Sequence, residues 1–218
     1  MDDDRAVVRR AVSLALAVSV FGLSFGVLMG DAGMGTGKAA AMSLLVFAGG
    51  AQFAAVSVVM AGGTQVAAVV SGLLLNVRLL PFGVSVAHLI GPGRLRRLAG
   101  AHLILDESTA LATATSDARL GRRAFWWTGA AIYVGWNAAT VLGVEVGQLF
   151  GSPEDLGLDG AFPAVFVALL VPRLAEPGAR TAAVVGAAVA LVLVPLAPPG
   201  IPVLAATLGA LVARRVAR

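Results

Sequence analysis

Residues 65–90 read QVAAVVSGLLLNVRLLPFGVSVAHLI, an apolar run in which Arg78 is the single charged side chain at neutral pH. A transmembrane helix needs about 20 mostly apolar residues, so this run is long enough to cross a bilayer. Arg78 lies about a dozen residues from either end of the run, and an arginine near the bilayer centre costs at least about 2.5–3.5 kcal/mol on insertion scales. We therefore expect Arg78 to face the protein interior and to find an acid; the alternative is a side chain that snorkels to a headgroup.

The whole chain has the composition of a membrane protein. Of its 218 residues 58% are hydrophobic and 13% are charged, with a mean hydropathy of +0.90, whereas an ordinary soluble domain is about 25% charged. The charges gather in short connectors, as expected for spans separated by wet loops. We predict an all-α integral membrane protein with a single membrane domain over residues 1–218. The absence of cysteine excludes disulfides, thiolate metal sites and cysteine nucleophiles.

Eight apolar segments, the fourth weaker than the rest, can be read between glycine, proline and acidic turn signals. They cover approximately residues 11–30, 39–61, 65–90, 99–116, 124–149, 160–174, 180–197 and 200–213. We predict a polytopic bundle of about 6–8 transmembrane helices, some of them broken or re-entrant. The start, MDDDRAVVRR, is typical of a retained first span because no cleavage site follows a short apolar core.

The basic residues predict the orientation, because cytoplasmic loops are enriched in Lys and Arg. With eight spans and a cytoplasmic N-terminus, most basic residues fall inside, and the acidic loop with Glu154 and Asp155 falls outside. The cluster Arg94–Arg97 also falls outside, which is contrary to the enrichment of basic residues in cytoplasmic loops. A scheme with six crossings moves this cluster inside and leaves Lys38 outside. Both schemes place both termini in the cytoplasm.

Glycines recur every four residues in the first and fifth segments. The two series are Gly22, Gly26 and Gly30, and Gly143, Gly147 and Gly151. On a helix such a series leaves a groove in which another backbone can approach closely. Packing is the first interpretation, and a groove that lines a substrate path is the alternative. Gly26 and Gly30 precede Gly143 and Gly147 by 117 residues, which indicates either an internal repeat or a chance match in an Ala/Val/Gly-rich chain.

Two features favour breaks in the apolar helices. Gly49 and Gly50 precede Gln52 in mid-segment, which weakens helical regularity and adds an amide with four hydrogen-bonding positions. Either Gln52 bonds to a neighbouring helix, or the helix breaks and its freed backbone groups face a binding cavity covered by protein or water. In the next segment Pro81 has no N–H and leaves the carbonyl of Val77 without its usual partner.

Polar side chains accompany Arg78 in the third segment. Asn76 lies two residues before it. Ser71 and Ser85 lie seven residues to either side, so we expect all three residues to share one helix face. Trp136 and its aromatic neighbours in the fifth segment indicate an interfacial belt and packing.

The expected partner of Arg78 lies in the fourth segment. His102 and Asp106 are four residues apart and would share one helix face, with Glu107 about 100° round the helix. A carboxylate buried in an apolar setting holds its proton more tightly, so Asp106 or Glu107 could carry a proton at physiological pH. The alternative is an interfacial helix over 99–116 whose polar face meets water.

The order of these motifs resembles the AzlC family, the large subunits of bacterial branched-chain amino acid exporters. The matching stretches are Phe47–Phe53, Asn76–Arg78, Asp106–Leu111, Trp127–Gly147 and Asp159–Ala164. Gly50 stands where Ala is expected, and Thr109 stands where an aromatic residue is common. These departures bear on packing or substrate preference.

The resemblance implies a permease of the bacterial inner membrane that exports leucine, isoleucine, valine or related amino acids with a small hydrophobic AzlD-like partner. Arg78 or helix N-terminal N–H groups would bind the substrate carboxylate, and freed carbonyls or Asp106 its ammonium group. Proton antiport through Asp106 or Glu107 is the hypothesised coupling. The residues expected to bind substrate are Gln52, Asn76, Arg78 and Asn137.

Two other classes of function stay open. One is a membrane assembly subunit whose transport is done by another chain. The other is an intramembrane hydrolase that uses Ser24 with His88 or His102, although the Gly-x-Ser-x-Gly motif around Ser24 needs a strand-to-helix turn. We expect no enzyme activity, no cofactor, no metal and no nucleic-acid binding, since two histidines and no cysteine leave only carboxylates as metal ligands.

Overall fold

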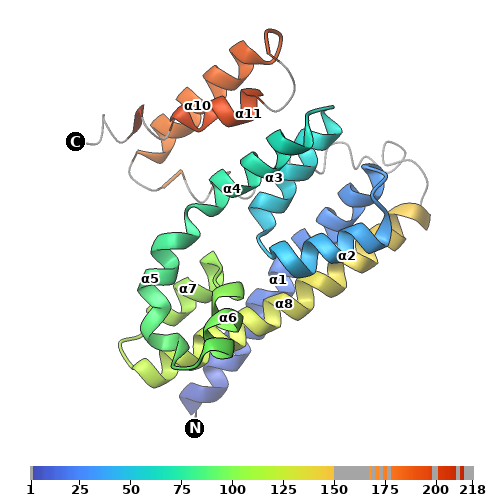
Figure 1. The fold of residues 1–218 in the computed structure, drawn as a ribbon. Coiled ribbons are helices and arrows are strands. Elements are labelled where there is room, and N and C mark those ends of the chain that lie inside the picture. The colour runs from blue at the N-terminus through green and yellow to red at the C-terminus, as the bar shows by residue number, and fades with distance from the viewer. Residues whose placement is uncertain are drawn as a thin grey trace. The chain divides into compact units, whose positions relative to one another are not determined.

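The computed structural model describes residues 2–149, 167, 170, 171, 174, 175, 178–197, 201–209, 212 and 213, and every regular element in this part is a helix. The helices are α1 (Asp2–Asp31), α2 (Gly35–Val46), α3 (Gly49–Met60), α4 (Gln65–Asn76), α5 (Leu79–Ile90), α6 (Arg94–His102), α7 (Asp106–Thr113), α8 (Ala118–Leu149), α10 (Ala179–Leu193) and α11 (Ile201–Ala206) (Figure 1). The all-helical prediction is confirmed for these residues. Most of the predicted segment 160–174, and the acidic loop before it with Glu154, Asp155 and Asp159, lie outside the described residues.

The chain separates into two compact units. Unit 1 comprises Met1–Gln52 and Leu75–Phe150, and unit 2 comprises Phe53–Leu74 and Gly151–Arg218. Within unit 2, α10 and α11 pack through small residues, since a Cβ at Gly186 would lie 2.9 Å from the carbonyl oxygen of Ala206. The candidate site belongs to unit 1. The single membrane domain over residues 1–218 stays a prediction.

Helices α1 and α8 form a parallel pair that frames unit 1 (Figure 1). Near the start of both helices, Asp4 pairs with Arg119 and Arg123. Near their ends, Gly30 lies against Val144. The two helices therefore run side by side in the same direction over most of their length.

The glycine series lie in the contact between α1 and α8. A Cβ at Gly26 would lie 2.9 Å from the Cα of Gly143 and would collide with the carbonyl oxygen of Thr140; a Cβ at Gly143 would collide with the carbonyl oxygen of Leu23. Glycine is needed on both helices because backbone occupies the space where side chains would stand. The groove is filled by the facing helix, so the alternative of a substrate path along these glycines is wrong at this point.

The contacts across this pair are reciprocal at one sequence offset. Gly26 meets Thr140 while Gly143 meets Leu23, and Gly30 meets Val144 while Gly147 meets Val27. In both cases, each α8 residue is the α1 residue of the other contact shifted by 117 positions along the sequence. Reciprocity of this kind marks a local two-fold relation, in which the same surface is used on both sides. It agrees with the offset of the predicted internal repeat.

The predicted segments 39–61, 65–90 and 99–116 are each interrupted. The first breaks at Phe47–Ala48, the second at Val77–Arg78 and the third at Leu103–Leu105. Two expectations based on continuous helices are therefore wrong. Ser71, Arg78 and Ser85 do not share one helix face, because Ser71 is in α4 and Ser85 in α5. His102 ends α6 and Asp106 begins α7, so they also lie on different helices.

One helix in the described part of the chain, Asp4–Asp31 within α1, is by itself long and apolar enough to cross a membrane. The bent pair of α4 and α5 would count as a second span if it crosses as one unit. Helices α3 and α10 are shorter apolar helices. The structure thus supports an all-helical class, and about six to eight crossings stay a prediction.

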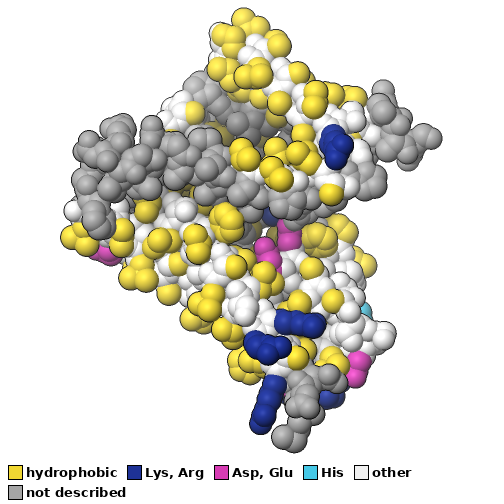
Figure 2. All heavy atoms as spheres, turned by 180° about the vertical axis from the view of Figure 1, so that it is seen from behind, with side chains coloured by type: hydrophobic (Ala, Val, Ile, Leu, Met, Phe, Trp, Pro, Cys, Tyr) yellow, Lys and Arg dark blue, Asp and Glu magenta, His cyan; other side chains and the backbone are white. Residues whose placement is uncertain are grey.

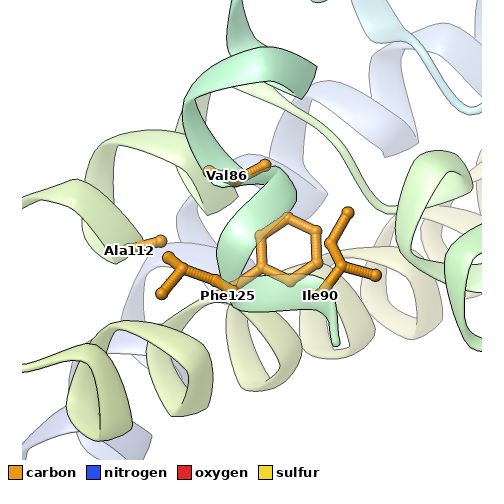
Figure 3. Packing of buried hydrophobic residues seen from close by; sticks show 5 residues of the cluster. Val86, Ile90, Ala112 and Phe125 are labelled. Atoms are coloured by element: carbon orange, nitrogen blue, oxygen red, sulfur yellow. The ribbon is translucent and has the colours of Figure 1, made fainter. Parts of the chain in front are cut away.

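A small hydrophobic cluster holds α5 and α7 on α8. Val86, Leu89 and Ile90 of α5 pack with Ala112 of α7 and Phe125 of α8 (Figure 3). Phe125 and Val86 are fully buried. Because this cluster fixes where α5 and α7 lie, it also fixes the residues at their starts, which belong to the site described below.

We predict that Gly26→Ala destabilises the protein by about 1–3 kcal/mol, the usual cost of overpacking, because its methyl group would collide with the backbone of Thr140. Gly37→Ala is the matched control, since nothing lies within 4 Å of a Cβ there, and it should be neutral or slightly stabilising. Thermal unfolding of the purified protein in detergent measures both. Equal stability of the two variants would contradict the close α1–α8 contact.

Candidate functional site

The candidate site begins at the break between α2 and α3. Helix α2 ends at Val46, its cap residue Phe47 is in the left-handed region at φ 40°, and α3 begins at Gly49. Two groups from other helices approach where side chains are missing. A Cβ at Gly49 would lie 2.8 Å from the ring of Trp136, and a Cβ at Gly50 would lie 3.3 Å from Nη2 of Arg78. An indole ring and a guanidinium group therefore cover the start of α3.

Arg78 lies at the break between α4 and α5 and pairs with Asp106. Its Nη1 donates to Oδ2 of Asp106 at 2.7 Å, and the two side chains are 39% and 19% exposed. Pro81 contributes to the break because it cannot donate to the carbonyl of Val77, which instead accepts the N–H of Leu80 at 3.1 Å. The structure thus pairs Arg78 with an acid of the predicted fourth segment.

Asp106 and Glu107 are the first two residues of α7, and both are partly buried. Carboxylates are favourable there because the start of a helix carries partial positive charge. Ser108 fixes this start: its Oγ accepts the N–H of Leu105 at 2.9 Å and donates to the carbonyl of Leu103 at 2.7 Å. The two acids therefore have a structural role at the helix start beside any chemical one.

Three helix starts meet at this ion pair. Gly50 in the first turn of α3 lies beside Arg78, Arg78 immediately precedes α5, and Asp106 opens α7. Each start contributes up to roughly half a positive charge, and Arg78 adds a full charge. The carboxylates of Asp106 and Glu107 offset most of this sum. The site therefore holds opposite charges in close contact where three helices begin.

The carbonyl of Leu44, near the end of α2, finds side-chain donors. It accepts Nε2 of His102 at 2.9 Å and the hydroxyl of Tyr133 at 3.4 Å. The rings of Phe47, His102 and Tyr133 pack against one another, with centroids 4.8–5.7 Å apart. A continuous helix would supply a backbone N–H to this carbonyl, so the aromatic cluster replaces the bond that the break removes.

The other residues expected to bind substrate have these positions. Gln52 is fully buried in α3, and its Nε2 donates to the carbonyl of Met42 across the break at 3.2 Å. Asn76 is the last residue of α4. Asn137 donates to the carbonyl of Tyr133 in its own helix at 2.7 Å. Within the described residues, the side-chain oxygens of Gln52, Asn76 and Asn137 accept no hydrogen bond, so each keeps an acceptor for another donor.

Sequence reasoning missed the positions of Trp136, Tyr133 and His102 around the α2–α3 break. The sequence assigns the aromatic residues of α8 to a belt and to packing, yet Trp136 is buried over Gly49. The signal for the other two is the break itself. A buried carbonyl that loses its helical partner must find another donor, and His102 and Tyr133 are among the few donors in these apolar segments.

Ser24 does not lie at a nucleophile elbow, and no metal site is found among the described residues. Ser24 lies within α1, where its hydroxyl donates to the carbonyl of Val20 at 3.2 Å. It is therefore not on the strand-to-helix turn that a nucleophile elbow requires. No group of three or more His, Asp or Glu side chains is placed to hold a metal ion in this part of the chain.

These features define a membrane protein that is helical throughout its described part and has a charged site where apolar helices break. Residues 13–150 match the family model described as AzlC protein. The chain belongs to the AzlC family, and the match covers every residue of the candidate site.

Two relatives come from Helicobacter pylori, strains J99 and 26695. Each is 25% identical to the chain over 187 residues, which is 85% of this chain and 82% of the relative. Both relatives are described as uncharacterized membrane proteins. No solved structure matches the chain.

We predict that Arg78 and Asp106 stabilise the protein jointly. Arg78→Gln and Asp106→Asn should each lower the free energy of unfolding, because each removes one of the two charges of a partly buried ion pair. The double variant should lose less than the sum, with a coupling energy of about 0.5–1 kcal/mol. We place it at this low end because Arg78 is 39% exposed. Thermal unfolding of the wild type, the two single variants and the double variant measures this double-mutant cycle. Strictly additive losses of stability would argue against an energetic coupling between Arg78 and Asp106.

Proposed function

We propose that this member of the AzlC family is the permease subunit of a bacterial exporter of branched-chain amino acids. The observation that carries the proposal is the Arg78–Asp106 ion pair at the meeting point of three helix starts. Membership of a transporter-associated family supports transport rather than catalysis. The proposed location is the inner membrane, with both termini in the cytoplasm and a small AzlD-like subunit as partner.

The ion pair suits the two charged ends of an amino acid. Arg78 and the N–H groups at the start of α3 would hold the carboxylate, since Gly49 and Gly50 carry no side chains at that helix start. Asp106 would hold the ammonium group. Because the two protein charges already neutralise each other, a zwitterion can replace their mutual contact with one contact at each end.

Aromatic carbon borders the start of α3 and would contact the substrate side chain. Trp136 lies over Gly49 and stacks on Phe25 with ring centroids 6.2 Å apart. Phe47 caps the end of α2 at the same break. Burial of a branched side chain against such a surface contributes about 0.8 kcal/mol per CH₂ group. Leucine, isoleucine and valine are therefore favoured over smaller or polar amino acids.

Proton antiport is the proposed coupling. Protonation of Asp106 would remove the negative partner of Arg78 and release the ammonium group of the substrate. Glu107, the next residue of α7, is the second candidate to carry the proton. The two carboxylates at one helix start share one positive end, so proton binding to one of them lowers the mutual repulsion.

We predict that Asp106→Asn or Glu107→Gln removes the coupling of transport to the proton gradient. In proteoliposomes, at least one of them should abolish the stimulation of labelled leucine transport by a pH gradient, because the neutral side chain cannot exchange a proton. Asp117→Asn is the control, since Asp117 accepts the N–H of Arg119 outside the site and asparagine caps a helix equally well. If both neutral variants keep gradient-driven transport, the proposal of antiport through these residues is wrong. The proposal that the chain is a permease subunit would be unaffected.

We predict that labelled leucine flux requires both this chain and the small subunit. Reconstitution of the chain alone, the small subunit alone and both together gives the comparison. Arg78→Gln within the complete complex should reduce flux at least tenfold, because it removes the charged contact to the carboxylate. Full flux in the complex with Arg78→Gln would favour the assembly-subunit alternative, in which another chain carries the substrate.

A further inference from the structure

Arginines from three helices gather at one end of unit 1. They are Arg5, Arg9 and Arg10 of α1, Arg94, Arg96 and Arg97 of α6, and Arg119, Arg122 and Arg123 of α8. The starts of α1 and α8 lie together, because Asp4 contacts two of the α8 arginines. Helix α6 reaches the same region, since the Arg96 guanidinium lies 5.6 Å from the centre of the Trp126 ring. Figure 2 shows Lys and Arg side chains gathered where α1 starts.

Acidic groups offset only part of this charge. Oδ2 of Asp4 lies 3.2 Å from Arg119 and 3.3 Å from Arg123. The sequence near these helix starts adds Asp2, Asp3 and Asp117, which makes four aspartates against nine arginines by sequence count. Five positive charges are in excess. This end of unit 1 therefore attracts anions, and most of its arginine side chains are exposed.

Helix α6 combines this charge with an exposed apolar face. Leu95 and Leu98 are 84% and 61% exposed, and they lie beside the exposed Arg94 and Arg97. The opposite face of α6 is fixed, because Gly100 packs directly on Ile90 at the end of α5. Exposed leucines between arginines are typical of a helix that lies in the membrane interface.

The position of α6 bears on the crossing scheme. Eight crossings would place Arg94–Arg97 on the opposite side of the membrane from Arg5 and Arg119. The structure instead brings these arginines to one end of unit 1. The six-crossing scheme also puts all three groups on one side of the membrane, although the number of crossings stays a prediction.

We propose that this arginine-rich end is a binding site for anionic phospholipid headgroups, with α6 lying in the interface. Arg94 and Arg97 bind the phosphodiester, and Leu95 and Leu98 enter the acyl region beside it. The leucines select a lipid over a soluble phosphate, because only a lipid covers both the charges and the apolar face. The site is independent of the proposed transport site, since none of its residues contacts the Arg78–Asp106 pair in the described hydrogen bonds and ion pairs.

Lipid binding by the purified full chain tests the proposal. Short-chain phosphatidylglycerol, phosphatidylcholine and glycerol phosphate are titrated separately, and the thermal shift gives an apparent affinity. Wild type should bind phosphatidylglycerol, and Arg94→Gln/Arg97→Gln should bind it roughly 30-fold more weakly, from about a kilocalorie per mole per arginine. Lys38→Gln is the control, because Lys38 is an exposed cation on α2, outside the arginine-rich end, and it should leave the affinity unchanged.

Three outcomes would overturn the lipid assignment. An equal affinity for phosphatidylcholine would remove the role of charge. An equal affinity for glycerol phosphate would indicate a soluble-anion site. An unchanged affinity in the double arginine variant would place the lipid elsewhere. Leucine flux is not part of the readout, so failure of the transport proposal leaves this test intact.

Spin labelling tests the placement of α6 directly. The chain has no cysteine, so Leu95→Cys and Leu98→Cys each give one labelled position without background. In phosphatidylglycerol-containing nanodiscs, collision with oxygen should exceed collision with a water-soluble nickel reagent at both positions. Gly37→Cys, at an exposed position in the first turn of α2 with open space around it, is the water-exposed control. Labels at 95 and 98 that behave like the control would overturn the interfacial placement.

Discussion

A helix that stops inside an apolar segment leaves backbone N–H and C=O groups that lipid cannot satisfy, and this constraint shapes unit 1. The carbonyl groups at the breaks find donors within the protein: His102 and Tyr133 for Leu44, the N–H of Leu80 for Val77, and Ser108 for Leu103. The helix starts at the same breaks differ from these carbonyl groups, because they lie beside charged side chains. At the breaks, carbonyl groups thus accept hydrogen bonds from side-chain and backbone donors, whereas helix starts lie beside charged side chains.

The closely packed parallel pair of α1 and α8 holds in place the side chains that pack against these breaks. Its glycines let two backbones touch, and the reciprocal contacts at an offset of 117 residues show that both helices use the same surface. Because α8 is held so closely, its side chains have fixed positions along the pair. Trp136 can then cover the start of α3, and Phe125 can anchor α5 and α7. The precision of the site therefore derives from a contact that is remote from its charges.

The sequence was sufficient for the helical class, for the family and for the pairing of Arg78 with an acid of the fourth segment. The helical class and the pairing of Arg78 each follow from a strong energetic penalty. Apolar surface is unfavourable in water, and an unpaired charge is unfavourable in lipid. The breaks were harder to place. Gly49, Gly50 and Pro81 indicate that two segments are weak, but the third, at Leu103–Leu105, carries no proline or glycine. Its break depends on Ser108 and on a packed Leu103 beside Gly129, and such tertiary contacts cannot be read from periodicity.

The ion pair itself explains how proton and substrate would be coupled on the proposed function without communication over a distance. Oδ2 of Asp106 lies 2.7 Å from Nη1 of Arg78, so the guanidinium, a proton and a substrate ammonium group all compete for one carboxylate. A proton on Asp106 frees Arg78 for the substrate carboxylate while it excludes the ammonium group. Loss of the proton restores the carboxylate of Asp106, which can then bind either Arg78 or the ammonium group of the substrate. Binding of the two species is therefore linked through a single contact, and the strength of that contact sets the coupling energy.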